Sequence, residues 1–96
     1  MSYFVCIAQI KINSGKEKRL LKELSALIKP TTAEPGCVSY ELFQNVNQPQ
    51  SFTMIEFFHS KEDFDFHQSQ DYLLHYRETS KNLIESSQLI FCLTID

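Results

Sequence analysis

The sequence is short of the residues and patterns that mark several large classes of protein. It has two Gly and three Pro in 96 residues, too few for a collagen-like, linker or low-complexity chain. Lys and Arg number nine against twelve Asp and Glu, which gives a formal charge of −3 and no basic field to bind phosphates. We therefore expect no nucleic-acid partner.

No hydrophobic run is long enough for a membrane span or a signal sequence. The apolar segment at residues 3–8 stops at Gln9, whereas a span needs about 20 apolar residues. The three cysteines, Cys6, Cys37 and Cys92, are odd in number and form no CxxC pair, which favours free thiols in a reducing compartment. We expect an unprocessed cytoplasmic protein with no membrane partner.

The chain does contain enough apolar material for one hydrophobic core. Hydrophobic residues make up 43% of the sequence and aromatic residues 12%, so apolar burial can offset the loss of chain entropy. A chain of 96 residues is too short for two independent cores. We expect a single domain over residues 1–96.

Four segments are predicted as strands, because β-branched and aromatic residues gather in them between turn-forming residues. They cover residues 3–12, 37–44, 52–59 and 89–95, and the polar segment 45–51 joins the two middle strands as a hairpin with a long loop.

Two segments with helical periodicity separate these strands. The first begins at Lys16, and Pro30 is expected to disrupt its C-terminal end. The second begins at Ser60, which forms a variant of the capping box with Asp63, and extends to about residue 68. Ser69 is a candidate cap for a further helical stripe that reaches about residue 85. The positions predicted to face the core are Leu20, Leu21, Leu24, Leu27, Ile28, Tyr72, Leu73, Tyr76, Leu83 and Ile84.

The resulting order, β-α-β-β-α-β, is that of a ferredoxin-like α+β fold, in which the helices cover one face of a four-stranded antiparallel sheet. The other face should be polar if it met water. However, apolar residues point to both sides of at least three strands; in the first, Cys6 and Ala8 face one side and Val5 and Ile7 the other. Because that much exposed apolar surface is abnormal for a monomer, we predict a homodimer formed sheet against sheet.

Several stretches of the sequence together resemble the antibiotic biosynthesis monooxygenase (ABM) family. They are residues 34–43 (EPGCVSYELF), residues 52–64 (FTMIEFFHSKEDF) and His67, which follows Ser60 by seven residues. Residues 15–17 (GKE) also resemble the helix entry of the family. The resemblance covers nearly the whole chain and implies a dimeric ferredoxin-like barrel, in agreement with the order predicted from periodicity.

Members of the family include cofactor-independent oxygenases of quinols and polycyclic phenols, haem-degrading enzymes, and enzymes that act on small signalling ketones. The resemblance implies a monooxygenase that uses dioxygen on a small aromatic or quinol-type substrate and needs no bound metal, flavin or haem. Haem degradation is disfavoured here, because Ala8 and Gln9 stand nearest the first-strand Asn of the haem-degrading members and the chain has no Trp.

Two residues are candidates for the acid–base chemistry of such an enzyme. His67 matches the histidine of the family, and imidazole titrates near neutral pH, so it is the leading candidate for the base or the orienting group. Glu56 lies among apolar neighbours in the third predicted strand, where it is either a buried carboxyl group with a raised pKa or the partner of a basic side chain such as Arg77.

Other candidates would form the substrate-binding walls. Aromatic rings with a hydroxyl group suit a planar phenol, and two of the tyrosines are four residues apart on one helix face. An arginine beside them could orient an oxyanion, although each of these side chains could instead belong to the core. The candidates are Tyr40, Met54, Phe58, Tyr72, Tyr76 and Arg77.

Asp63, His67, Asp71 and His75 recur every four residues and would line up as metal ligands on one continuous helix. A break at Ser69 would prevent that alignment, so we interpret them as polar pairs on a solvated face. Two other functions stay open: an isomerase or detoxifying enzyme for a small oxygenated carbonyl compound, and a non-enzymatic dimeric ligand-binding module.

Overall fold

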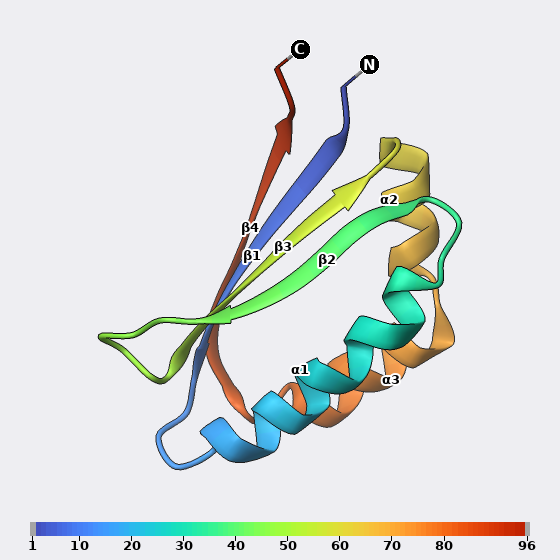
Figure 1. Cartoon of the computed structure of the whole chain (residues 1–96). Helices are drawn as coiled ribbons and strands as arrows, with labels where there is room; N and C mark the ends of the chain where they lie inside the picture. The colour runs from blue at the N-terminus through green and yellow to red at the C-terminus, as the bar shows by residue number, and fades with distance from the viewer. Residues whose placement is uncertain (1, 96) are drawn as a thin grey trace.

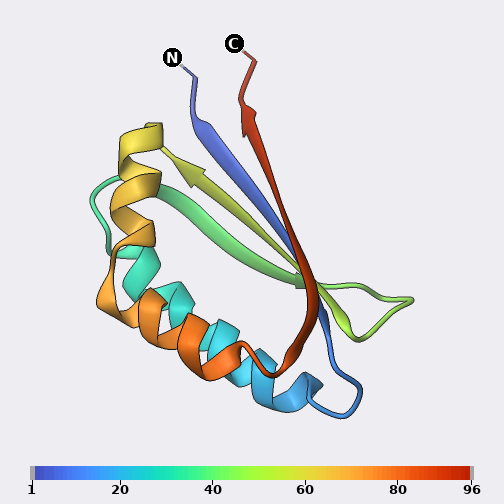
Figure 2. The same ribbon diagram turned by 180° about the vertical axis from the view of Figure 1, so that it is seen from behind.

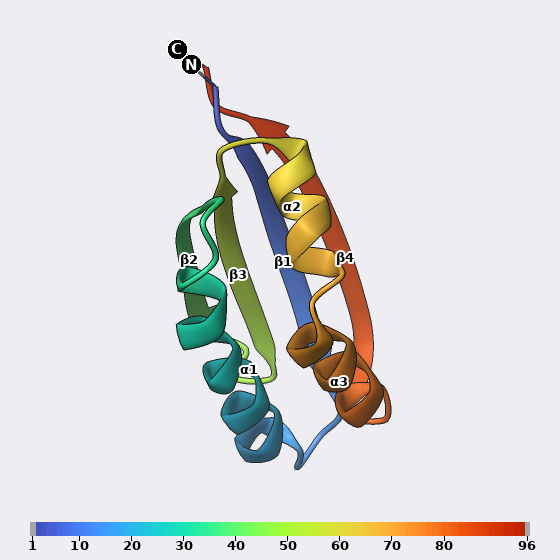
Figure 3. The ribbon, with the colours of Figure 1, turned by 90° about the vertical axis from the view of Figure 1, so that its right-hand side faces the viewer.

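The computed structural model describes residues 2–95 and confirms the predicted ferredoxin-like architecture, with the second helical segment split in two. In chain order the elements are β1 (Phe4–Ile12), α1 (Glu17–Thr32), β2 (Cys37–Gln44), β3 (Ser51–Phe58), α2 (Lys61–Gln68), α3 (Asp71–Ser80) and β4 (Ile84–Leu93). The strands form one antiparallel sheet in the order β2-β3-β1-β4, and all three helices lie on the same face of it (Figures 1 and 3).

The register of the sheet explains its two-sided apolar pattern. Ile7 pairs with Ile55 of β3 on one side and with Ile90 of β4 on the other, so the three side chains form an apolar row on the face without helices. No helix of residues 2–95 covers this face, and Ile90 is 37% exposed. The ends of β1 and β4 also project beyond the helices, side by side (Figure 2).

Helix α1 continues through Pro30 to Thr32, so the prediction that Pro30 disrupts its end is wrong. A proline costs one main-chain hydrogen bond and crowds the preceding turn, but later donors still close the last turn. The main-chain N–H groups of Ala33 and Glu34 donate to the carbonyl oxygens of Lys29 and Thr31 at 3.2 and 3.0 Å. This extra turn fixes the positions of Thr31 and Glu34.

Helix α3 ends at Ser80, so the prediction of a helix to about residue 85 and a strand from residue 89 is wrong. Leu83 and Ile84 are not part of the helix, although they continue its apolar spacing. Ile84 pairs with Ile12, the register shifts at Glu85, and the polar residues 86–88 join β4 because residues 9–11 of β1 supply their main-chain partners.

The helix cap predicted at Ser60 is present at the start of α2, whereas the cap predicted at Ser69 for the next helix is not. The main-chain N–H of Asp63 donates to Oγ of Ser60 at 3.2 Å, as the predicted capping box requires. Ser69, expected to start the next helix, instead ends α2, and Gln70 precedes α3 without a side-chain cap.

The core lies between the sheet and the helices. Leu20, Leu24 and Leu27 of α1 are buried in this core as predicted. Leu21, also predicted to face the core, is exposed. All three cysteines are free, as predicted. None of the helices within residues 2–95 is long and apolar enough to cross a membrane.

Candidate active site

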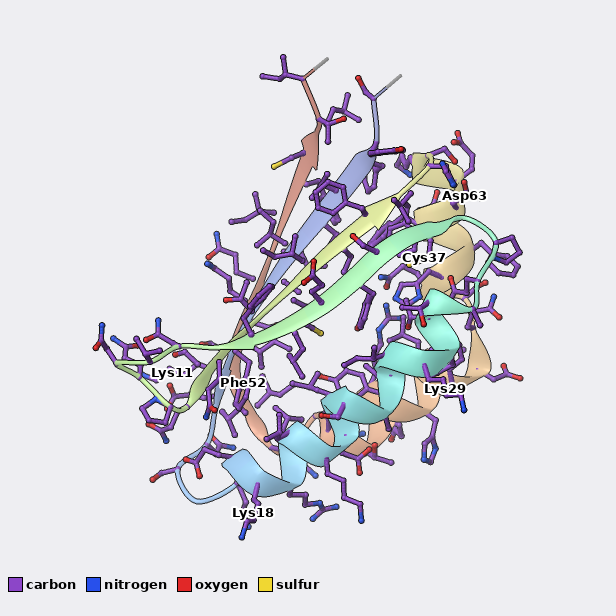
Figure 4. All side chains as sticks on the ribbon, viewed as in Figure 1. Lys11, Lys18, Lys29, Cys37, Phe52 and Asp63 are labelled. Atoms are coloured by element: carbon purple, nitrogen blue, oxygen red, sulfur yellow. The ribbon has the colours of Figure 1, made fainter. Side chains whose placement is uncertain are left out.

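A cleft of about 500 Å³ lies between the helix-covered face of the sheet and helix α3. Ala8, Met54 and Leu89 of three neighbouring strands line its sheet side, and Leu73 and Tyr76 of α3 line the helix side. Side chains fill the rest of the layer between sheet and helices, in which Cys37 and Phe52 lie toward opposite ends of the sheet (Figure 4). The volume is in the range of small-molecule sites.

A buried pair, His67 and Glu34, stands beside this cleft. Nδ1 of His67 lies 2.9 Å from Oε2 of Glu34, and the His67 side chain is only 1% exposed. His67 comes from the last turn of α2, and Glu34 follows the extra turn of α1. Burial excludes the water that would otherwise compete for this charge-assisted hydrogen bond.

The carboxylate of Glu34 is held by Tyr72 of α3 as well as by His67. The Tyr72 hydroxyl donates a hydrogen bond to Oε2 of Glu34 and lies 3.2 Å from Oγ1 of Thr31. Because a hydroxyl has a single proton, Tyr72 donates to Glu34 and accepts from Thr31. Burial, reinforced by the bond to Glu34, raises the pKa of Tyr72 above its usual range, so the hydroxyl stays a donor.

The hydrogen bond to Glu34 determines which nitrogen of His67 is basic. Nδ1 must hold a proton to donate to the carboxylate, so Nε2 of the neutral imidazole keeps its lone pair. Nε2 points toward the side chain of Glu56, whose Oε1 is 3.9 Å away, too far for a hydrogen bond. His67 is therefore arranged to accept a proton at Nε2.

Glu56 is a buried carboxyl group that lines the cleft. Burial raises its pKa from 4.5 to about 8; the nearby Glu34 adds to the rise and Arg77 opposes it. At neutral pH most of the population is uncharged and can donate a hydrogen bond. Oε1 of Glu56 is buried without a hydrogen-bond partner among residues 2–95, so a donor or acceptor on a ligand would satisfy it.

Aromatic rings enclose the imidazole of His67. The ring centroids of Tyr40 and Phe58 are 5.9 and 5.3 Å from it. The Tyr40 hydroxyl donates to Sδ of Met54 at 3.3 Å, and burial raises the pKa of Tyr40 above its usual range. This tyrosine is thus a neutral group next to the cleft.

Helix α3 contributes three polar residues to the cleft, Tyr76, Arg77 and Ser80. The buried hydroxyl of Tyr76 lies close to Ser80 but makes no hydrogen bond of good geometry within residues 2–95, and burial raises the pKa of Tyr76. Arg77, one residue further along, is exposed and lines the cleft. Nη1 of Arg77 donates to the main-chain oxygen of Gln68 at 3.4 Å.

The structure brings most of the candidate residues to one place. Those that line the cleft are Tyr40, Met54, Glu56, His67, Tyr76 and Arg77. Tyr72 and Phe58 contact His67 from outside the cleft: Tyr72 reaches it through Glu34, and Phe58 packs against its ring. Tyr72 and Tyr76 therefore contribute to different parts of the site despite their four-residue spacing.

Sequence reasoning missed Glu34 and Thr31 as members of the site. Glu34 was interpreted only as part of a loop and a family motif, and Thr31 lies beyond the proline expected to disrupt α1. The available signal was an acidic residue directly before Pro35 and Gly36. Gly36 allows the chain to pass against α2, since a Cβ atom there would lie 2.3 Å from Cγ of Asp63.

Asp63, His67, Asp71 and His75, which are spaced four residues apart, do not lie along one continuous helix. Helix α2 ends at Gln68 and α3 begins at Asp71, which confirms the break in the helix. Asp71 and His75 are exposed, but His67 is buried, so its assignment to a solvated face is wrong. Residues 2–95 contain no group of three or more acid, His or Cys side chains placed to hold a metal ion.

The cleft also contains a thiol. Cys6 lines the cleft next to Glu56 in the adjacent strand, and burial raises the pKa of this thiol to about 12. A thiol with so high a pKa is almost entirely protonated at neutral pH and is a poor nucleophile.

Comparison with known proteins identifies the class of protein to which this chain belongs. The family model described as "Antibiotic biosynthesis monooxygenase" matches residues 3–79. The chain therefore belongs to the ABM family.

Relatives of known structure share the whole fold. PA3566 of Pseudomonas aeruginosa is 26% identical and superposes with a TM-score of 0.95 over 100% of this chain and 97% of its own. SO0527 of Shewanella oneidensis is 31% identical, with a TM-score of 0.93 over 97% of this chain and 91% of its own.

Two curated relatives align with most of this chain. "Putative monooxygenase YcnE" of Bacillus subtilis is 27% identical over 79 residues, which is 82% of this chain and 83% of YcnE. The uncharacterized protein sll1783 of Synechocystis is 26% identical over 80 residues, which is 83% of this chain. The chain spans 54% of the length of sll1783.

Proposed function

We propose that this protein is a monooxygenase that oxidises a small phenolic or quinol-type aromatic with dioxygen and needs no bound metal, flavin or haem. Family membership supports the monooxygenase-like role. The observation that carries the proposal is the buried His67–Glu34 pair, which directs a basic nitrogen toward a ring-sized, largely apolar cleft. His67 acts as the base, and Glu34 is the positioning residue that fixes its tautomer.

The proposed reaction begins with removal of the phenolic proton by Nε2 of His67. The neutral carboxyl group of Glu56 and the hydroxyl group of Tyr76 then donate hydrogen bonds to the phenolate. The phenolate transfers an electron to dioxygen, and a bond forms between the reduced oxygen and a ring carbon that bears hydrogen. Loss of that hydrogen and cleavage of the O–O bond give the quinone and one water, so the substrate supplies all the electrons.

Oxygen uptake by the purified protein tests this proposal. With 1-naphthol, 1,4-dihydroxynaphthalene or anthrone as substrate, we expect one dioxygen consumed per substrate oxidised without added cofactor. His67→Ala should lower the rate by about 10²-fold or more, the usual contribution of a general base. His75→Ala removes an exposed histidine from α3 and serves as the matched control. Equal rates for the His67→Ala variant and the unaltered protein with every phenol accepted would refute the role of His67.

The same acid–base pair favours a second candidate function. Nε2 of His67 and the carboxyl group of Glu56 are 3.9 Å apart, with the pKa of Glu56 raised so that it is a neutral acid beside a base. Such a pair can move a proton between two positions of a small oxygenated carbonyl compound, as an isomerase requires. Substrate loss without oxygen uptake would favour this isomerase. Ligand binding without conversion would favour the non-enzymatic binding module.

We also propose that two copies associate through the faces of the sheet that no helix covers. Ile7, Ile55 and Ile90 form the centre of this face, and Phe57 extends it along β3. Burial of such a surface against a second copy stabilises both subunits, and an isologous contact gives twofold symmetry.

The cytoplasm is the proposed location, because three free thiols suit a reducing compartment.

A further inference from the structure

Charged side chains gather where the cleft opens beside α3 and the start of β4. Arg77, Lys81 and Glu85 line this opening. Lys81 is neutralised by Glu78, with Nζ and Oε1 2.8 Å apart, and Glu85 is neutralised by Lys11, with Oε2 and Nζ 3.3 Å apart. Only the charge of Arg77 remains to be balanced among these three.

Arg77 has no anionic partner in the described part of the chain. No carboxylate of residues 2–95 forms an ion pair with its guanidinium group, which donates only a long hydrogen bond to the main chain of Gln68. The charge of Arg77 acts on the carboxyl group of Glu56 and lowers its pKa. Burial has the larger effect and raises the pKa of Glu56 to about 8, so Glu56 is mostly uncharged at neutral pH. The cleft therefore contains an unbalanced positive charge in a protein whose net charge is −3.

Arg77 and the proposed base lie at different depths. The Arg77 side chain is exposed at the opening, whereas His67 is buried beside Glu56. The sheet side of the same cleft presents the apolar side chains of Met54 and Leu89, which suit the faces of an aromatic ring. A ligand whose hydroxyl group lies beside His67 can therefore present a second substituent to the guanidinium group of Arg77.

From this arrangement we propose that the ligand is an aromatic carboxylate whose carboxylate group binds Arg77 while its ring occupies the apolar part of the cleft. A guanidinium group binds a carboxylate through two parallel hydrogen bonds, and partial exclusion of water by the cleft strengthens them. The inference rests on the proposed function only in taking this cleft as the substrate site. It narrows the substrate class from phenols in general to phenols that also carry a carboxylate.

Binding of two probes without a phenolic group tests the inference separately from the chemistry. The probes are 2-naphthoate and 2-naphthamide, which have similar size and differ in charge, titrated calorimetrically under nitrogen at pH 7. We expect 2-naphthoate to bind at least about tenfold more tightly, as a charge-assisted pair in a partly buried site allows. Arg77→Gln should abolish the preference, and Arg77→Lys should keep part of it.

Arg19→Gln is the matched control, because it makes the same change on the exposed side of α1, away from the cleft, and should leave the preference intact. Equal affinity for the two probes, or a preference that survives Arg77→Gln, would overturn the inference. Because the binding assay needs no turnover, a preference for 2-naphthoate together with no oxygen uptake from a phenol that also carries a carboxylate, such as 6-hydroxy-2-naphthoate, would refute only the proposed reaction. Oxygen uptake together with equal affinities for the two probes would refute only the proposal that the ligand carries a carboxylate bound to Arg77.

Discussion

His67 and Glu34 are 33 residues apart in the chain, yet Nδ1 of one lies 2.9 Å from Oε2 of the other in the interior of the protein. The contact depends on two local features. Helix α1 continues past Pro30, which carries Glu34 toward the sheet, and the last turn of α2 directs His67 to meet it. Tyr72 approaches the same carboxylate oxygen from α3. Helices α2 and α3 and the turn after α1 thus fix the orientation of one imidazole ring.

Replacement of Glu34 by Gln should impair this orientation with little effect on substrate binding. The amide has no negative charge to stabilise the imidazolium that forms when Nε2 accepts a proton. We expect kcat to decrease by about 10- to 100-fold, less than for loss of the base itself because His67 is still present, and KM to change little. Steady-state oxygen uptake measures both constants for Glu34→Gln.

Glu62→Gln removes a carboxylate from the exposed first turn of α2 and provides the control for overall charge. It should leave kcat unchanged. A Glu34→Gln variant with normal kcat, or a loss confined to KM, would contradict the positioning role of Glu34.

The raised pKa of Glu56 predicts that the stability of the protein falls as pH rises. Between about pH 4.5 and 8 the unfolded chain ionises this carboxyl group while the folded protein keeps it protonated. The folded state then binds more protons, so the free energy of unfolding decreases by up to about 1.4 kcal/mol per pH unit in this window. Above the folded-state pKa, both states are ionised and this contribution levels off.

Glu56→Gln isolates that contribution, because the amide keeps the shape of the side chain and cannot ionise. Urea unfolding at intervals from pH 5 to 8.5 should give a shallower fall for the variant than for the unaltered protein. Parallel curves would show that Glu56 titrates in the folded state as it does in the unfolded state, and would remove the neutral acid from the proposed site.

The fold was predictable because its strands and helices carry separate periodic signals. The alternation from Val5 to Ile12 and the stripe of Leu20, Leu24 and Leu27 each define one element without help from the rest of the chain. The prediction failed at the start of β4, where Ser86 and Ser87 have weak strand propensity. There the main-chain pairing with Ile10 and Lys11 determines the conformation, and this pairing is a tertiary contact that local sequence does not encode.

The site was predictable only in part for a similar reason. His67 and Glu56 stood out as polar residues in apolar or motif surroundings, and the structure places them 3.9 Å apart. Glu34 lies in a turn, where acidic residues are common and usually solvated, so its burial depends on the packing of α1 against α2 and α3. The separation of Tyr72 from Tyr76 likewise follows from the orientation of α3, which residue spacing alone does not give.

Gly36 should be required for the close approach of the turn after α1 to α2. A Cβ atom at this position would lie 2.3 Å from Cγ and 2.4 Å from Cβ of Asp63, so Gly36→Ala must displace one segment. We expect a loss of about 1–3 kcal/mol in the free energy of unfolding, as for other overpacked sites. Thermal and urea unfolding measure it. In an Asp63→Gly background, where all the clashing side-chain atoms are absent, the cost of Gly36→Ala should shrink, and an unchanged cost would exclude this contact as its cause.

Ile55→Lys should convert the proposed dimer into a monomer. The side chain lies at the centre of the uncovered face, opposite Ile7 in the register of the sheet, so a lysine there would place a charge inside the contact between two copies. Leu74→Lys is the matched control, because Leu74 is an exposed apolar residue of α3 on the helical side, where no contact is proposed. Sedimentation velocity over a range of concentrations should show a dimer for the unaltered protein and for Leu74→Lys, and a monomer for Ile55→Lys. A monomer in all three cases would mean that the apolar face of the sheet is exposed in the isolated subunit, and the proposed association would be wrong.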